Sequence, residues 1–467
     1  MKNMTLRAMT KACGGQYYGD EAFLDKEVGS ITIDSRKVEP DSLFIAIRGE
    51  RSDGHTFIKD CYDKGALCVI SEHVLENETH PYIKVDSSLQ ALKDLALLYR
   101  SSLDVKVVGI TGSVGKTSTK ETISAVLSQK YKVLKTLGNY NNEIGLPLTV
   151  FRLKEDDEVA VLEMGISDFG EMERLTAIAR PDICVITNIG LCHLENLKTR
   201  DGILKAKTEI FKSMNPEGRV VLNGDDDKLI TVNEVYGKTP LFFGISYKDG
   251  VYADNIENLG LDGSRFLIHG VKSSDGKDTF EITIPVPGRH MIYNAMAAAC
   301  VGACMGLTSS QIVEGISQME TIAGRNNIIK TGNYTIIDDC YNANPVSMKA
   351  SVDVLSMAVG RKVCILGDMF ELGDNEKELH YDVGEYLGTK NIDVLVTIGN
   401  LSRQIALGTK NYMENNYKAH DCKVYSYETK KEFMESMEQI LCNGDNILIK
   451  ASHGMAFAEI VKALSEQ

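Results

Sequence analysis

The sequence predicts an α/β protein organised in three domains, and three observations support this prediction. The chain has 467 residues, which is longer than a single compact core usually allows. Short, continuously apolar runs alternate with amphipathic segments, as expected where helices connect parallel strands. This pattern changes near residues 103 and 322, so we expect domains over residues 1–103, 104–322 and 323–467.

The first domain is expected to be a small α/β unit. Apolar runs predict short strands at residues 30–34, 42–49, 67–71 and 82–86. A helix is expected at 87–100, because its apolar residues recur on one helical face, at Leu89, Leu92, Leu95, Ala96 and Tyr99.

The central and third domains are predicted to contain mostly parallel sheets. Strands of the central domain are expected at 104–110, 159–164 and 182–188, and helices at 170–179, 203–214 and within 291–318, with a β-rich stretch at 230–287. Strands of the third domain are expected at 334–339, 362–367, 393–399 and 446–452. One helix is expected to start at about Pro345, and a second helix is expected to end near residue 388. This alternation predicts a doubly wound, Rossmann-like third domain.

Composition excludes several classes of protein. The 51 basic and 65 acidic side chains give a formal net charge of −14, which argues against binding to nucleic acid or to an anionic membrane surface. No apolar run approaches the roughly 20 residues that span a bilayer, and the first residues lack the apolar core of a secretory signal. The eleven cysteines form no CxxC pair, and no His/Cys pair at zinc-finger spacing accompanies Cys300 and Cys304. We therefore expect a monomeric, cytoplasmic protein with reduced thiols.

The segment "GITGSVGKTST" at residues 109–119 is typical of a loop that binds phosphate groups. Its glycines allow backbone N–H groups to converge on phosphate oxygens at the start of a helix. Lys116 is expected to neutralise the β and γ phosphates, and the Thr117 hydroxyl to bind Mg²⁺. The usual pattern has glycine where this chain has Ile110. A tight strand–helix turn without a ligand is the alternative, but the Lys-Thr pair after an apolar strand favours nucleotide binding.

Lys207 falls on the apolar face of a predicted helix, among Ile203, Leu204, Ile210 and Phe211. A lysine in such a position must reach solvent, form an ion pair or lose its charge. Desolvation lowers the pKa of an amine, and the free amine can react with CO₂ to form a carbamate, a carboxylate-like metal ligand. The alternative is a lysine whose stem covers the core while its amine stays in solvent.

Two further residues follow strands of the central domain, at the edge where parallel sheets bind ligands. Glu163 ends one strand, and an acidic residue in this position often binds Mg²⁺. His193 follows the next strand along the chain, although a single histidine is more often an ordinary loop or core residue.

Segments throughout the chain resemble those of the Mur ligases, in the order "TGSVGKT", "GNYNNEIGLPLT", "LEMG", "ITNIGLCHLE", "AKTEIF", "PGRHMIYNAMAA", "GR" at 324–325, "DDCYNANP" and "LGDMFELG". The segment "ITIDSRKVEPDSLFIAIRGERSDGH" resembles the amino-terminal domain of two members of this family. One member adds D-alanyl-D-alanine, and the other adds a single diamino acid. "DDCYNANP" and "LGDMFELG" favour the first member, and the "DNPR" motif of the second is absent.

The resemblance implies that the chain uses ATP to join D-alanyl-D-alanine to UDP-MurNAc-tripeptide through an acyl phosphate, for peptidoglycan synthesis. It implies two Mg²⁺ ions and a carbamate on Lys207. Catalytic roles are implied for Lys116, Glu163, His193 and Lys207, and metal binding for Thr117, Glu163, His193 and carbamylated Lys207. ATP contacts are implied for Thr111, Gly112, Ser113, Val114, Gly115, Lys116, Thr117, Ser118, Asn294 at the adenine, Arg325 at the γ-phosphate and Asp339 at the ribose. Substrate contacts are implied for Asp34, Ser35, Arg36, Gly54, His55, Asn139, Asn141, Asn142, Tyr341, Asn342 and Asn344.

Each of these roles has a simpler alternative. Asn294 could cap a helix, Asp339 could be a carboxylate on an edge strand, and "YNANP" could be a turn before a helix. Three residues differ from those common in the family: Cys192 replaces alanine, Met291 replaces asparagine and His453 replaces arginine.

Other functions remain as alternatives. The diamino-acid-adding Mur ligase and folylpolyglutamate synthase share this ATP site, but the "DSRKV…DGH" segment favours a UDP-MurNAc substrate over a folate. A nucleotide-dependent switch is a different class of protein, and a GTPase would carry an NKxD motif, which the chain lacks.

Overall fold

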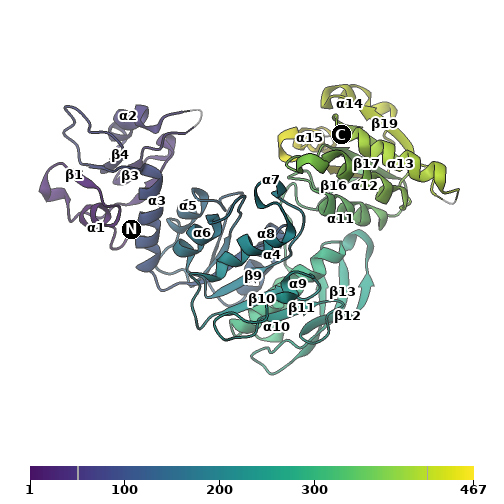
Figure 1. The fold of residues 1–467 in the computed structure, drawn as a ribbon, viewed down its shortest axis with the longest axis horizontal. Helices are drawn as coiled ribbons and strands as arrows, with labels where there is room; N and C mark the ends of the chain where they lie inside the picture. The colour runs from purple at the N-terminus through teal and green to yellow at the C-terminus, as the bar shows by residue number, and fades with distance from the viewer. Residues whose placement is uncertain (50–51, 418, 467) are drawn as a thin grey trace.

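The structure is a computed structural model that describes residues 1–49, 52–417 and 419–466. Within these residues the strands form three sheets, of five, nine and six strands. Each sheet belongs to its own segment of the chain, and the predicted α/β class is confirmed. In Figure 1 the first segment (purple) and the third (green to yellow) lie at opposite ends, with the central segment (teal) between them.

The first sheet has the order β1-β5-β4-β3-β2, and β1 is its one antiparallel strand within the described residues. Its strands are β1 (Gln16–Tyr18), β2 (Ser30–Thr32), β3 (Ser42–Ile45), β4 (Cys68–Ser71) and β5 (Tyr82–Lys84), and its helices are α1 (Leu6–Ala12), α2 (Ile58–Asp63) and α3 (Ser88–Ser101). The predicted apolar face of α3 is buried at Leu92, Leu95 and Tyr99. These side chains join a core that continues into the central domain, because α3 also packs on α5 and α6.

The central sheet has the order β14-β13-β12-β11-β10-β9-β6-β8-β7, parallel from β7 to β12 and antiparallel beyond. Its strands are β6 (Lys106–Thr111), β7 (Val133–Lys135), β8 (Val159–Glu163), β9 (Ile183–Ile186), β10 (Arg219–Asn223), β11 (Leu241–Gly244), β12 (Val251–Asn258), β13 (Ser264–His269) and β14 (Thr279–Ile284). Its helices are α4 (Lys116–Leu127), α5 (Gly145–Val150), α6 (Glu171–Ala179), α7 (Leu194–Leu197), α8 (Arg200–Thr208), α9 (Arg289–Cys304) and α10 (Ser309–Ser317). The helix predicted at 203–214 thus begins earlier and continues as a 3₁₀ turn to Phe211.

The third sheet has the order β15-β16-β20-β17-β18-β19, and all its pairs except β15 with β16 are parallel. Its strands are β15 (Asn327–Lys330), β16 (Tyr334–Asp338), β17 (Lys362–Gly367), β18 (Val394–Ile398), β19 (Lys423–Tyr427) and β20 (Asp445–Lys450). Its helices are α11 (Pro345–Ser356), α12 (Glu376–Gly388), α13 (Arg403–Asn415), α14 (Lys430–Ser436) and α15 (Ala458–Ser465). Apolar clusters on both faces of this sheet match the predicted doubly wound arrangement.

The sheets position the functional loops. Strands β6, β8 and β9 are neighbours, so the loops that follow them meet at one edge of the central sheet. The loop after β16 meets them from the third sheet, and α11 lies on the side of the third domain that faces the central domain (Figure 1). None of the described helices combines the length and the apolar character needed to cross a bilayer.

Candidate active site

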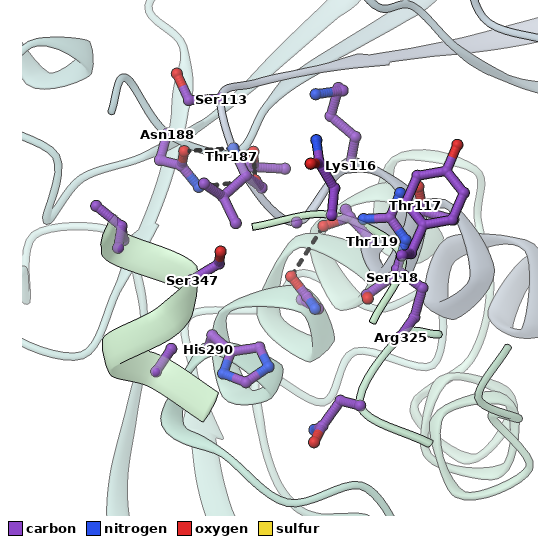
Figure 2. Close-up of a pocket in the computed structure, with 18 of the residues that line it drawn as sticks. Ser113, Lys116, Thr117, Ser118, Thr119, Thr187, Asn188, His290, Arg325 and Ser347 are labelled. Atoms are coloured by element: carbon purple, nitrogen blue, oxygen red, sulfur yellow. Dashed lines mark hydrogen bonds between the residues drawn. The ribbon is translucent and has the colours of Figure 1, made fainter. Parts of the chain in front are cut away.

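A cavity of about 600 Å³ lies between the central and third domains. The central domain contributes the phosphate loop, the loop before α5 and the start of α9, and the third domain contributes segments 324–326 and 339–351. Figure 2 shows Lys116 and the start of α4 on one side of this cavity and Ser347 of α11 on the other. This volume is typical of a site for a small organic ligand.

The phosphate loop connects β6 to α4 as predicted, and residues 113–118 line the cavity. Gly112 has φ 149°, and a Cβ at this position would lie 1.9 Å from Thr187 Oγ1. Gly115 precedes the helix with φ 83°. Both glycines are therefore required by the path of the backbone. Thr111 and Gly112 are not among the residues that line the cavity.

Two residues that the sequence interpretation missed hold the loop in place. Asn188 Oδ1 accepts a hydrogen bond from Val114 N at 2.9 Å, and Thr187 Oγ1 donates to Val114 O at 2.6 Å (Figure 2). Both residues follow β9, the neighbour of β6 in the sheet. The polar end of the predicted strand "DICVITN" was the signal that could have identified them.

Lys116 lies half-buried at the start of α4, and its Nζ donates to Gly112 O at 2.9 Å. Burial lowers the pKa of this amine, while the nearby Glu163 carboxylate acts in the opposite direction. The amine therefore lies inside the loop, where it can reach a bound phosphate.

Glu163 ends β8 with an exposed fraction of 2%. Its Oε1 accepts from Asn141 Nδ2 at 2.9 Å, whereas the buried Oε2 has no hydrogen-bond partner in the described part of the chain. An unpaired buried carboxylate oxygen is costly unless a cation binds it. The buried Thr117 lines the same cavity, so the two residues offer oxygen donors of the kind that suits Mg²⁺. No group of three or more His, Cys, Asp and Glu side chains placed to hold a metal ion is found in the ranges the structure covers.

Lys207 is buried on α8 with an exposed fraction of 1%, as its helical position predicts. No hydrogen bond or ion pair of its amine is found among the described residues. Burial and, to a smaller extent, the charge of Lys116 lower the pKa of Lys207 to about 8. The alternative in which the amine reaches solvent is therefore wrong, because both the stem and the amine are enclosed.

His193 lies in the left-handed backbone region with φ 50°, directly before α7. Its Nδ1 is 3.5 Å from Glu371 Oε2 of the third domain. Burial and, to a smaller extent, the charges of Lys207 and Lys116 lower the pKa of His193 to about 4. His193 and Lys207 are thus neighbours of the phosphate loop, although neither lines the cavity.

The third-domain residues take part in defined contacts at the cavity wall. Arg325 Cζ lies 4.0 Å from the centre of the Tyr341 ring. Asp339 follows β16, an interior strand, so the edge-strand alternative is wrong. Its carboxylate forms an ion pair with Lys450 and accepts from Ser351 Oγ at 2.6 Å.

The asparagines divide into two groups. Asn139, Asn141, Asn294, Asn342 and Asn344 line the cavity, and Asn142 does not. Asn142 and Asn344 cap turns, because each side-chain oxygen accepts backbone N–H groups of a following helix. Asn294 lies inside α9, so the helix-cap alternative is wrong, and its Oδ1 accepts from Thr119 Oγ1 at 2.9 Å.

The first-domain residues lie outside the cavity. The Arg36 guanidinium lowers the pKa of Asp34 to about 2 through a hydrogen-bonded pair. Both ring nitrogens of His55 are engaged, Nδ1 with Asp53 Oδ1 at 2.7 Å and Nε2 with Glu72 N at 3.0 Å. Ser35 and Gly54 belong to the adjoining 3₁₀ turns. Positions 50 and 51 of the resembling segment lie outside the described residues.

Comparison with known proteins relates this architecture to one family. The profile of the Mur ligase family, catalytic domain, matches residues 27–100, that of the Mur ligase middle domain matches 110–302, and that of the Mur ligase, glutamate ligase domain, matches 324–453. A UDP-N-acetylmuramoyl-tripeptide–D-alanyl-D-alanine ligase of Bacillus subtilis (strain 168) is 38% identical over 94% of this chain and 93% of its own. The chain belongs to the Mur ligase family.

Solved Mur ligase structures share the fold over the whole chain. MurF from Acinetobacter baumannii has a TM-score of 0.88 at 29% identity and covers 99% of both chains. MurF from Thermotoga maritima, in complex with ADP, has a TM-score of 0.81 at 28% identity and covers 94% of this chain and 97% of its own. The predicted family and its three-domain α/β fold are thereby confirmed. The domain boundaries at 103 and 322 and the individual residue roles stay predictions.

Proposed function

We propose that this Mur ligase uses ATP to join D-alanyl-D-alanine to the terminal carboxylate of UDP-MurNAc-tripeptide. The product is UDP-MurNAc-pentapeptide for peptidoglycan synthesis. The observation that carries the proposal is full-length similarity to ligases of this specificity. The cavity supports it, because the phosphate loop there faces residues of the third domain.

The reaction divides into two steps. A carboxylate oxygen of the tripeptide attacks the γ-phosphorus of ATP, the bond from this phosphorus to the β,γ-bridging oxygen breaks, and ADP leaves behind an acyl phosphate. The free amine of D-alanyl-D-alanine then attacks the acyl carbon, phosphate departs, and the amine loses a proton as the amide forms. Both steps concentrate negative charge, so fixed positive donors lower the barrier.

The chain supplies such donors at the phosphate loop. Backbone N–H groups of the loop and the Lys116 amine hold the β and γ phosphates, and Arg325 reaches the γ-phosphate from the third domain. Asn294 contacts the adenine and Asp339 the ribose. Asn139 and Asn141 face the γ-phosphate or the peptide end, while Tyr341, Asn342 and Asn344 contact the incoming dipeptide. Asn142, which lies outside the cavity, supports the turn that carries Asn141. The first-domain residues Asp34, Ser35, Arg36, Gly54 and His55 contact the UDP-sugar.

The donor set at Thr117 and Glu163 fits Mg²⁺, and His193 with Lys207 forms a second metal site. When bound, the ions neutralise the charge that develops on the phosphoryl and acyl oxygens. The enclosed, unpaired amine of Lys207 supports a carbamate. The neutral amine adds to the carbon of CO₂ and releases a proton, and the resulting anion offsets the surrounding positive charge.

We further propose a cytoplasmic monomer. Its eleven cysteines are all unpaired, as expected where thiols stay reduced. Both proposed substrates are nucleotide-linked or small and soluble.

The product mass tests the function. The protein is incubated with ATP, Mg²⁺, D-alanyl-D-alanine and the lysine or diaminopimelate form of UDP-MurNAc-tripeptide, with Lys116→Ala as the inactive control. We expect one tripeptide form to gain the mass of one dipeptide residue, and hydroxylamine to trap a hydroxamate. Transfer of a free diamino acid to a UDP-MurNAc-dipeptide would instead identify the diamino-acid-adding reaction.

A further inference from the structure

Lys120 is a fully enclosed lysine that the proposed reaction does not use. It lies on α4 one helical turn beyond Lys116 and has an exposed fraction of 1%. Burial of a charged amine costs free energy that only well-formed partners offset. An apolar side chain of similar length would fill this space at lower cost. The partners of Lys120 therefore indicate what the charge is for.

Two groups pair with the Lys120 amine. Its Nζ lies 2.8 Å from Glu121 Oε1, and Glu121 also pairs with Lys135 at the end of β7. The second partner is the backbone of Thr136, whose carbonyl oxygen accepts from Lys120 Nζ at 2.7 Å. Lys120 thus links α4, the helix after the phosphate loop, to the chain segment that directly follows β7.

Thr136 in turn holds the end of β8. Its N donates to Val161 O at 3.1 Å, and its buried hydroxyl accepts from Glu163 N at 3.0 Å. The segment that follows Thr136 carries Asn141, whose Nδ2 donates to Glu163 Oε1 and whose carbonyl accepts from Gly165 N. The backbone and one carboxylate oxygen of Glu163 are therefore both set by the segment that Lys120 fastens.

We propose that Lys120 is a positioning residue that acts through Thr136 and Asn141 to aim the unpaired Glu163 oxygen at the metal ion bound with the nucleotide. This inference rests on the proposed function only for the metal role of Glu163. Lys120 is not among the residues that line the cavity, so its removal should weaken the Mg²⁺-dependent part of nucleotide binding and leave the Mg²⁺-independent part. Groups that orient a metal ligand typically change metal affinity by about tenfold to a hundredfold when removed.

The measurement is the affinity for the non-hydrolysable ATP analogue AMP-PNP with and without Mg²⁺, by calorimetry on the full chain. The quantity compared is the dissociation constant without Mg²⁺ divided by the dissociation constant with Mg²⁺. We expect this ratio to fall by about tenfold to a hundredfold in Lys120→Met, with little change in the Mg²⁺-free affinity. Lys130→Met is the control, because Lys130 lies in the turn after the same helix and also donates to a carbonyl, that of Gly306, so we expect it to keep the wild-type ratio.

A second pair of variants tests the contact between Thr136 and Glu163 and leaves the buried Lys120 unchanged. Thr136→Val removes the hydroxyl that accepts from Glu163 N and keeps the side-chain shape, so we expect the ratio to fall. Thr136→Ser retains the hydroxyl, so we expect the wild-type ratio. This pair decides the question if Lys120→Met does not fold, as judged by its Tm.

A wild-type ratio in folded Lys120→Met, or in Thr136→Val, would overturn the positioning role while the ligase reaction stands. A wild-type protein whose AMP-PNP affinity ignores Mg²⁺ would overturn the metal role of Glu163 and the inference with it. The ligase proposal is tested separately by the mass of its product.

Discussion

The chemistry of Lys207 and Glu163 depends on their burial, which separates their polar atoms from water. Glu163 Oε2 is a buried oxygen without a hydrogen-bond partner among the residues described, and Lys207 is a lysine whose exposed fraction is only 1%. Such atoms are uncommon in folded proteins, and at a functional site they indicate a ligand that the protein itself does not contain. The Glu163 carboxylate suits a cation directly, whereas the Lys207 amine would suit one only after conversion to a carbamate.

Replacing Lys207 by alanine tests the carbamate. We expect the rate of pentapeptide formation to fall by about a hundredfold or more, because a charged group at the reacting phosphates is lost. A short carboxylic acid such as acetate should restore part of that rate, since it can occupy the place of the carbamate, and removal of bicarbonate should have no effect on the variant. Steady-state rates with increasing acetate provide the measurement.

Lys205→Ala is the control for this experiment. Lys205 lies on the same helix but is exposed, so its loss should leave the rate unchanged. Absence of rescue in Lys207→Ala, at any acetate concentration that wild type tolerates, would argue against the carbamate.

At the scale of elements, the phosphate loop is shaped by its contact with the end of β9. Thr187 and Asn188 both bond to Val114, and Gly112 passes directly against Thr187. The loop is therefore preorganised by a neighbouring strand, in addition to its own glycines.

Gly112→Ala should disrupt this contact, because the new Cβ would lie 1.9 Å from Thr187 Oγ1 at φ 149°. We expect AMP-PNP affinity to fall by roughly tenfold or more as the loop shifts. Gly332→Ala is the control, since its Cβ would meet no atom within 4 Å. Wild-type affinity in Gly112→Ala would show that the loop adapts without cost.

Asp225 links the turn after β10 to the segment after β11 and to α9. Its carboxylate accepts from the backbone of Ile245 and Tyr247 and from the Tyr293 hydroxyl. Burial raises the pKa of Asp225, but hydrogen bonds from Ser246 N, Tyr293 and the neighbouring backbone outweigh this, so the pKa lies below its usual value. A carboxyl group whose pKa is lower in the folded state stabilises the fold above its unfolded pKa of about 3.9.

We therefore expect the stabilisation from Asp225 to be complete near neutral pH and to be lost as pH falls below about 4. Asp225→Asn should lower Tm by a few degrees at pH 7, consistent with about 1.5–3 kcal/mol for hydrogen bonds to a charged group. The gap from wild type should shrink in acid, as followed by scanning calorimetry. Asp227→Asn, which removes an exposed partner of Arg200, should change Tm little. A Tm gap for Asp225→Asn that stays constant down to pH 3 would contradict this reasoning.

At the scale of the whole molecule, the proposed site draws on domains that are far apart in sequence. The cavity combines Lys116 of the central domain with Arg325 and Asp339 of the third domain. The predicted UDP-sugar contacts lie in the first domain, outside this cavity and at the other end of the molecule in Figure 1. A substrate that contacts all three domains at once requires these domains to approach one another.

We expect the molecule to become more compact when AMP-PNP, Mg²⁺ and UDP-MurNAc-tripeptide bind together. Small-angle scattering should show a smaller radius of gyration with all three ligands than without them. Arg325→Ala should reduce this compaction, because the contact from the third domain to the phosphates is lost. An unchanged radius at saturating ligand would rule out closure as part of the reaction.

The local patterns of the chain were sufficient for the α/β class, the phosphate loop and the position of Lys207 on an apolar helical face, whereas the burial of its amine was left open. A strand–glycine–Lys-Thr–helix order and an apolar helical face are properties of neighbouring residues, so they can be read without the fold. The strand Val133–Lys135 was missed, because its short Val-Leu run carries too little pattern and becomes a strand only by pairing with β8.

Tertiary structure alone decided which residues meet. Thr187 and Asn188 contact a loop more than 70 residues away because β9 pairs with β6. Lys120 lies in the polar run "KTSTKET", whose pattern gives no sign of burial, and only the packing of α4 on the sheet encloses it. The sequence by itself therefore determined the elements and the reactive groups. Sheet order and domain packing determined their partners, because those contacts join residues that are distant along the chain.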